Sequence, residues 1–283
     1  MARNNGDRLG APHTQVSNAP IGEAPPNPAM AFSTPTTFVD LPSKGSLYPE
    51  GHPLRGCEQI EIRFMTAKEE DILTSEALLK KGIAIDRMIQ SVILDKRIKV
   101  EELAVGDKNA IIIAARISGY GNDYEVGVSC PACGARTEYT FDLERATIQD
   151  GQDYGDFNIE KTENNTFGIT TPSLKAQVEM RPMYGVDEKY LTQLAANRKA
   201  KKLPSTSTTD QLRRLIVSVN GNTDGTYRES FITNAPARDT RYLRQAYRKV
   251  MPNIDLTQEF VCSSCGTETE MAVPLTAKFF WAQ

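Results

Sequence analysis

Hydrophobic and polar residues alternate along the chain in blocks that predict a strand followed by helices. Residues 60–64 (IEIRF) alternate apolar and polar, which is typical of a half-buried strand. Thr66 followed by Glu69 forms a capping-box pattern and predicts a helix from about Ala67 to Leu79. Two further helices are predicted: one capped by Asp86 with an apolar stripe at Met88, Ile89, Val92 and Ile93, and one from Lys108 to about Ser118, started by Gly106-Asp107 and stopped by Gly119-Tyr120-Gly121.

A β-hairpin is predicted directly after these helices. Alternating apolar residues lead into a Cys-x-x-Cys-Gly turn (Cys130, Cys133, Gly134) and out of it again. The residues that alternate are Tyr124, Val126 and Val128 before the turn, and Tyr139, Phe141 and Leu143 after it. The cysteine turn is therefore expected at the tip of the hairpin.

The second half of the chain repeats this order of elements. Val178 and Met180 belong to a predicted strand, and Val186–Ala196 and Thr209–Val219 read as helices. Asp239 opens a further helix that ends near Pro252. Leu256–Val261 then leads into a second turn, Cys262, Cys265 and Gly266, and Met271–Val273 leads out of it.

The two halves also match residue by residue. At an offset of 132 positions, Asp107 corresponds to Asp239, Ala114 to Ala246, Arg116 to Arg248, Asp123 to Asp255, Thr137-Glu138 to Thr269-Glu270 and Leu143 to Leu275. An upstream block matches at an offset of 118: Glu61, Arg63, Met65, Glu70 and Leu73 correspond to Glu179, Arg181, Met183, Glu188 and Leu191. We interpret this as an internal duplication; the alternative is chance similarity between two short hairpins.

These patterns give an α+β fold of two related helical lobes, each ending in a zinc-knuckle hairpin. Residues 1–37 are proline-rich with little aliphatic content, so they are expected to be disordered or extended. Residues 38–58 (Phe38, Leu41, Leu47 and Tyr48 among prolines and glycines) are expected to form a docking loop. Residues 59–145 form the predicted first repeat, 146–176 a polar linker and 177–283 the second repeat.

Four of the five cysteines predict a metal site. Two thiolates do not complete a structural site, but Cys130, Cys133, Cys262 and Cys265 together form a full tetrahedral zinc set. The histidines, His13 and His52, lie outside both turns. We therefore expect one zinc-ribbon-like Cys₄ site that joins the lobes and has a structural role. Two hairpins without metal, and a metal shared between two chains, are the alternatives. Cys57 is left over and reads as a passive apolar residue.

Composition limits the class of protein. A net charge of −3 and a pI near 5.6 disfavour a dedicated nucleic-acid binder. The chain has no apolar run long enough to cross a bilayer, and its first residues lack the apolar core of a secretory signal. The five cysteines fit a reducing compartment.

Three classes of function were weighed: structural protein, zinc-ribbon nucleic-acid binder and enzyme. The usual phosphate-binding, nucleophile-elbow and metalloprotease motifs are missing from the sequence, and the acidic runs KEED and KVEEL read as solvated helix faces, so we expect no enzyme. The nucleic-acid alternative depends on one basic helix. Its cations are Arg238, Arg241, Arg244, Arg248 and Lys249, with Arg213 and Arg214 as further candidates.

Two segments carry a resemblance to a known family. Residues 38–45 (FVDLPSKG) with Leu47-Tyr48-Pro49, and residues 100–121 running into Cys130-Pro131-Ala132-Cys133, resemble the T4-like phage baseplate hub subunits and the tail assembly chaperones of contractile-tailed phages. The resemblance is good over about residues 38–145 and weak in the second half.

This resemblance implies a non-enzymatic structural or assembly protein of a baseplate hub. Its partners would be other hub and tail proteins or further copies of itself, with nucleic acid not expected. It would be found in the host cytoplasm during assembly and in the virion tail baseplate.

Overall fold

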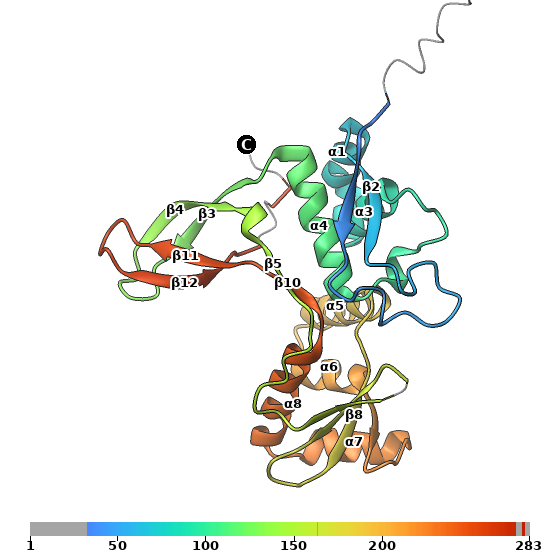
Figure 1. The fold of residues 1–283 in the computed structure, drawn as a ribbon. Helices are drawn as coiled ribbons and strands as arrows, with labels where there is room; N and C mark the ends of the chain where they lie inside the picture. Colours follow the sequence, from blue (N-terminus) through green and yellow to red (C-terminus); the bar gives the residue numbers. More distant parts are fainter. Residues whose placement is uncertain (1–32, 163, 276–278, 281–283) are drawn as a thin grey trace, which may run out of the picture. The chain divides into compact units, whose positions relative to one another are not determined.

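The first half of the protein is a two-stranded sheet packed against helices (Figure 1). The computed structural model describes residues 33–162, 164–275 and 279–280, so most of the predicted tail (1–37) lies outside the described residues. Strand β1 (Thr36–Asp40) pairs antiparallel with β2 (Gln59–Arg63). The helical elements that follow are α1 (Ala67–Thr74), α2 (Glu76–Lys80), α3 (Ala84–Val92), the 3₁₀ turn η2 (Val100–Glu102) and α4 (Val105–Tyr120).

The second half has a four-stranded antiparallel sheet in the order β6-β7-β8-β9. Its strands are β6 (Ile159–Lys161), β7 (Phe167–Thr170), β8 (Gln177–Met180) and β9 (Ile216–Val219). Its helices are α5 (Gly185–Ala200), α6 (Ser207–Leu215), α7 (Gly225–Asn234) and α8 (Ala237–Val250).

Two antiparallel hairpins lie side by side (Figure 1). The first is β3 (Asp123–Ser129) with β4 (Arg136–Asp142), and the second is β11 (Thr257–Val261) with β12 (Glu268–Ala272). After β4 come the 3₁₀ turn η3 (Leu143–Arg145) and β5 (Thr147–Gln149), which pairs antiparallel with β10 (Asn253–Asp255). Segments from both halves of the sequence therefore meet in one small sheet.

The buried apolar residues form two clusters. One lies mainly in the first half, but it includes Phe260, Cys262 and Val273 from the second hairpin. The other lies between the four-stranded sheet and helices α6 and α8, around Val178, Leu215 and Leu243. The second hairpin thus packs on the core of the first half. Among the described residues, no helix combines the length and apolar character needed to cross a membrane.

Two helix predictions were wrong in part. The helix predicted over 67–79 is divided into α1 and α2 because Ser75 adopts an extended conformation (ψ 109°). The helix predicted over 209–219 ends at Leu215, and Ile216–Val219 form β9, paired with β8. Ile216, Val217 and Val219 are β-branched, and pairing with β8 stabilises them as a strand although the local periodicity is helical. The segment predicted as a linker, 146–176, contains β5, β6 and β7.

The predicted docking loop packs largely on its own chain. Leu41, Leu47 and Tyr48 are buried in the first core, and the Tyr48 hydroxyl donates a hydrogen bond to Asp107 Oδ2 at 2.7 Å. Burial, followed by the charge of Asp107, raises the pKa of Tyr48 far above its ordinary value. These side chains are therefore occupied within the chain, whereas Phe38 on β1 is 64% exposed.

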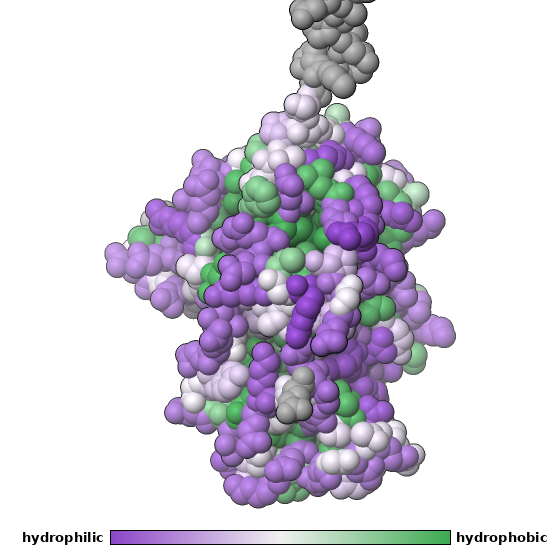
Figure 2. All heavy atoms as spheres, turned by 45° about the vertical axis from the view of Figure 1, so that its right-hand side comes forward, coloured by the Kyte–Doolittle hydropathy of each residue, from purple (hydrophilic) through white to green (hydrophobic). Residues whose placement is uncertain are grey.

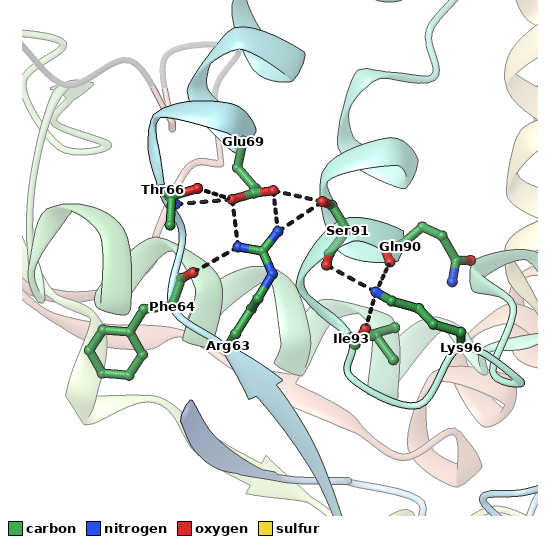
Figure 3. A network of polar contacts seen from close by, with 8 residues as sticks. All are labelled: Arg63, Phe64, Thr66, Glu69, Gln90, Ser91, Ile93 and Lys96. Atoms are coloured by element: carbon green, nitrogen blue, oxygen red, sulfur yellow. Dashed lines mark hydrogen bonds and ion pairs between the residues drawn. The ribbon is translucent and has the colours of Figure 1, made fainter. Parts of the chain in front are cut away.

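One carboxylate of the KEED run is buried, which corrects its interpretation as a solvated helix face. The Glu69 side chain is fully buried, and Arg63 donates to both of its oxygens, at 2.9 and 2.5 Å (Figure 3). Ser91 Oγ donates to it at 2.6 Å, and the predicted capping box with Thr66 is present. Burial raises the pKa of Glu69, but hydrogen bonds from Arg63, Ser91 and Thr66 outweigh it and hold the pKa at about 2.

The same network fixes the end of α3. Lys96 Nζ donates to the backbone carbonyls of Gln90, Ser91 and Ile93, which are carbonyls of the last turn and the C-cap (Figure 3). A cation at this position satisfies carbonyls that have no partner inside the helix and interacts favourably with the helix dipole. Strand β2, α1 and α3 are thereby held together by polar contacts as well as by the apolar core.

Candidate metal centre

Each cysteine pair lies in the turn of one hairpin, and the two turns have the same backbone hydrogen bonds. In the first, Cys130 N–H donates to Ala135 O at 2.9 Å and Gly134 N–H donates to Cys130 O at 2.9 Å. In the second, Cys262 N–H donates to Thr267 O at 3.0 Å and Gly266 N–H donates to Cys262 O at 2.8 Å.

Both turns require a glycine at the same position. Gly134 and Gly266 have φ values of 74° and 70°, in the left-handed region that residues with a Cβ seldom adopt. The glycine directs the chain back into the second strand, so that both thiols of each pair lie on one side of the turn.

The structure brings the four cysteines together. Their sulfur atoms all lie within 4.8 Å of one another, and the Cys130–Cys265 and Cys133–Cys262 Sγ distances are both 3.8 Å. Four thiolates at about 2.3 Å from a tetrahedral zinc ion would have sulfur atoms about 3.8 Å apart. The donor set therefore fits a tetrahedral metal ion with protein ligands at every position.

Packing between the hairpins holds this arrangement in place. The Tyr139 ring lies against Phe141 and Phe260, with centroid distances of 4.8 and 5.0 Å, and its hydroxyl donates to Glu259 O at 3.1 Å. Gln258 makes two hydrogen bonds with the backbone of Asp142, one accepted from its N–H at 3.2 Å and one donated to its carbonyl at 2.7 Å. The side chains that bring the two turns together lie in the strands, outside the cysteine turns.

The thiols differ in burial and in acidity. Cys130 and Cys262 are buried, whereas Cys133 and Cys265 are exposed. Hydrogen bonding by Thr267 lowers the pKa of Cys265 to about 6. The backbone N–H of Ala135 lowers the pKa of Cys133, but the neighbouring thiols and burial outweigh it and raise this pKa to about 11. Clustered sulfur atoms resist losing all their protons together unless a cation neutralises them.

The histidines and the fifth cysteine, which the prediction left out of the metal site, lie elsewhere. His13 is outside the described residues, and His52 is not in the cysteine cluster. His52 stacks on Tyr48 and lines a cavity of about 910 Å³, with Nε2 at 3.6 Å from Glu102 Oε2. Burial lowers the pKa of His52. Cys57, the leftover cysteine, donates from Sγ to Pro53 O at 3.4 Å.

The predicted basic patch is reduced by the structure. Arg213 pairs with Glu229 and Asp210, and Arg214 pairs with Asp187, so both charges are compensated. On α8, four cations are exposed: Arg238, Arg241, Arg248 and Lys249. Arg244 is half-buried and donates to Thr240 O at 3.4 Å.

Buried carboxylates are a feature that sequence reasoning missed. Asp107 and Asp239, predicted only as helix starts and repeat positions, are fully buried and accept hydrogen bonds from turns far away in the sequence. The sequence signal that could have identified them is their place in the first turn of a helix after a helix-starting residue, where a carboxylate accepts backbone N–H groups.

Comparison with known proteins agrees with this description. A family model described as "T4 bacteriophage base plate protein" matches residues 34–281, which include both hairpins and all four clustered cysteines. The search of curated proteins and the search of solved structures each gave no match. Because the match extends over most of the chain, the protein belongs to the T4 bacteriophage base plate protein family.

Proposed function

We propose that this chain is a non-enzymatic structural protein of the baseplate hub of a contractile phage tail, which acts by binding other tail proteins. Family membership implies phage tail proteins as partners and a location in the virion tail. The observation that carries the structural role is the set of four thiols contributed equally by two hairpins distant in sequence. We place its assembly in the host cytoplasm, before it enters the tail.

We propose a single structural zinc ion as the occupant of the cysteine cluster. The 3.8 Å sulfur separations suit its tetrahedral geometry, and thiolates select zinc over calcium or magnesium. Four protein ligands leave no open position for water, so the ion would stabilise the fold and would not activate a nucleophile. All four sulfur atoms come from one chain, which favours a metal within the chain over one shared between chains.

The cavity beside His52 is the other place where catalytic groups could meet, and its contacts support a non-enzymatic role. The cavity beside His52 contains Glu102 as a neighbour, but the pKa of His52 is lowered by burial and its Nδ1 already accepts the Leu54 N–H at 3.1 Å. The His52 ring also stacks on Tyr48, with ring centroids 4.5 Å apart, which supports a role in holding the loop. We propose that this cavity has no catalytic role.

We further propose that the two halves arose by duplication, and two repeated arrangements support this. The first is an arginine–carboxylate clamp. Arg63 and Arg181 each donate two hydrogen bonds to a buried carboxylate six residues later, Glu69 and Asp187. Each arginine also donates to the backbone carbonyl of the next residue, and each carboxylate accepts an N–H three residues before it.

The second arrangement is a serine turn held by a buried aspartate. Ser43 N–H donates to Asp107 Oδ1 at 2.9 Å, and Ser173 N–H donates to Asp239 Oδ1 at 2.8 Å. Both serines follow a proline, in the connection between two antiparallel strands: β1 to β2, and β7 to β8. We therefore propose that each copy begins at its first strand, so that the copies extend upstream of the predicted 59–145 and 177–283 to include β1 and β7.

Metal analysis of the purified protein tests the zinc site. We expect about one equivalent of zinc per chain, and a structural site of this type contributes on the order of 10 kcal/mol at neutral pH. Cys133→Ser should lose most of the zinc, whereas Cys57→Ser, which changes a thiol outside the cluster, should keep it. Less than about half an equivalent in the unmodified protein would contradict the proposal. Sedimentation before and after removal of the metal by a chelator distinguishes a metal bound within one chain from a metal shared between two chains. Only a shared metal would hold two chains together, so that its removal would lower the molecular mass.

Co-purification tests the role in the tail. The chain would be co-expressed with the tail proteins encoded in the same genome, and we expect it to be recovered in a defined complex with at least one of them. A double-stranded DNA fragment serves as the comparison ligand. A chain that associates with none of the tail proteins would refute the baseplate role, whatever its zinc content.

A further inference from the structure

Strand β1 has one edge paired with β2, and an opposite edge with which no strand pairs in the described part of the chain; we call this the open edge of β1. Its five residues pair with β2 from Thr36↔Arg63 to Asp40↔Gln59 without a shift in register. The far edge of β2 is covered by the end of α3, through the Ile62↔Ile93 bridge and the Leu94 N–H bond to Glu61 O. Within residues 33–162, 164–275 and 279–280, no strand pairs with the far edge of β1.

The hydrogen bonds at the two ends of the ladder show which backbone groups of β1 are open. Phe64 N–H donates to Pro35 O, and Leu41 N–H donates to Glu58 O. Hydrogen-bonded pairs recur every second residue in an antiparallel ladder, so Thr37 and Val39 also bond to β2. The N–H and C=O groups of Thr36, Phe38 and Asp40 therefore point away from β2.

The second half shows what occupies the equivalent edge. Strand β7 is, like β1, the strand that leads into a Pro-Ser turn held by a buried aspartate. Counted back from that turn, Gly168 and Thr170 stand where Phe38 and Asp40 stand in β1. Both belong to the set of residues that bond to β6, as the Thr170 N–H bond to Asn158 O shows. The backbone groups of β1 that point away from β2 therefore correspond to the groups of β7 that bond to the antiparallel strand β6.

The open edge has few of the devices that usually protect such edges, and its one charged residue, Asp40, lies at the end of the strand. Proteins guard exposed edges with charged side chains, especially lysine, and with proline, bulges or very short strands. Strand β6, the outer strand of the second sheet, has only three residues and carries Glu160 and Lys161. Strand β1 (TTFVD) contains no lysine, proline or bulge, and Phe38 at its centre is 64% exposed. In Figure 2, hydrophobic side chains reach the surface below the point where the described chain begins.

We propose that the open edge of β1 is a docking site for an extended segment of another tail protein, which adds as a third, antiparallel strand. This inference rests on the proposed function and specifies the kind of partner segment. Main-chain hydrogen bonds to Phe38 and Asp40 would bind the segment, and the Phe38 ring would favour an apolar or β-branched residue opposite it. A second copy of this chain, pairing β1 with β1, is the competing occupant, and the dilution series below distinguishes it.

Residue-resolved amide hydrogen exchange tests the proposal. It is measured on the free chain and on the complex purified after co-expression with the tail proteins of the same genome. In the free chain, Phe38 and Asp40 amides should exchange fast while Val39 and Leu41 amides, which bond to β2, are protected. In the complex, exchange at Phe38 and Asp40 should slow by at least about tenfold.

A pair of variants provides the matched control. Phe38→Pro removes both the ring and an outward N–H, and edge strands accept proline at such positions, so β1–β2 pairing should persist. Phe38→Thr removes the ring but keeps the N–H and a strand-forming side chain. We expect Phe38→Pro to lower recovery of the complex at least about tenfold more than Phe38→Thr does.

Three results would overturn the proposal. The first is a complex that forms while Phe38 and Asp40 amides still exchange fast. The second is equal recovery of the two variants. The third is protection of these amides already in the free chain, because this chain or a second copy would then cover the edge; a dilution series distinguishes those two. Failure to form any complex would instead refute the proposed function.

Discussion

Replacing Glu69 by glutamine should destabilise the protein in a pH-dependent way. The Glu69 side chain is fully buried, and its pKa is about 2 in the folded protein against an ordinary value of 4.5. This lowering of the pKa corresponds to about 3 kcal/mol of unfolding free energy at neutral pH. Glutamine keeps the size of the side chain but leaves Arg63 without its counter-charge, and breaking a buried pair typically costs about 3–5 kcal/mol.

The sign of the pH dependence follows from the direction of the shift. The folded-state pKa of Glu69 is depressed, so its contribution is complete above about pH 4.5 and is lost as the pH falls through about 2. At pH 3 less than half of this contribution should remain. The difference in stability between the unmodified protein and Glu69→Gln should therefore shrink on acidification.

Urea unfolding at pH 7 and pH 3 measures this difference. Other groups that titrate in this range, including the cysteine cluster, are common to both proteins and cancel in the comparison. Asp71→Asn is the matched control, because Asp71 lies on the same helix but is exposed, and it should change stability by less than about 0.5 kcal/mol. Two results would refute the assignment of Glu69 as a buried charged group. One is a Glu69→Gln protein as stable as the control at pH 7. The other is a stability difference between the unmodified protein and Glu69→Gln that stays constant from pH 7 to pH 3.

Two further predictions concern packing and nucleic acid. In Gly106→Ala, the new Cβ would lie 1.9 Å from Pro252 O, so α4 and β10 must move apart, and thermal unfolding should show a loss of stability of about 1–3 kcal/mol. Gly225→Ala is the control, because a Cβ there would have nothing within 4 Å. Equal stability of the two variants would contradict the close approach of Gly106 to Pro252. Fluorescence anisotropy with a DNA duplex should show no binding at about 50 mM salt; binding that is lost in Arg241→Glu would instead support the nucleic-acid alternative.

The cysteines show how much of the candidate metal site could be predicted from the sequence. Their spacing identified Cys130, Cys133, Cys262 and Cys265 as one set, and the structure brings their sulfur atoms within 4.8 Å. The spacing did not reveal what brings the two turns together. Tyr139 and Phe260 face one another across two hairpins about 120 residues apart in the chain, and alternation along one strand does not identify the partner of a side chain.

Predictions failed where a long-range contact overrode a local pattern. The KEED run has the composition of a solvated face, yet Glu69 is buried because Arg63 on β2 and Ser91 on α3 supply its hydrogen bonds. Residues 216–219 continue a helical pattern, yet they form β9 because β8 offers a strand to pair with. Both outcomes depend on residues that the local window does not contain.

The sequence alone determined the local chemistry of this protein: the cysteine turns with their glycines, the capping box at Thr66, the strands that lead into and out of the cysteine turns, and the similarity of the two halves. These follow from spacing, periodicity and backbone preference, which act over a few residues. Only the tertiary structure decided which of these local features meet. The convergence of four thiols, the burial of Glu69 and the open edge of β1 depend on contacts between distant segments, whose free energy depends on the whole chain being folded.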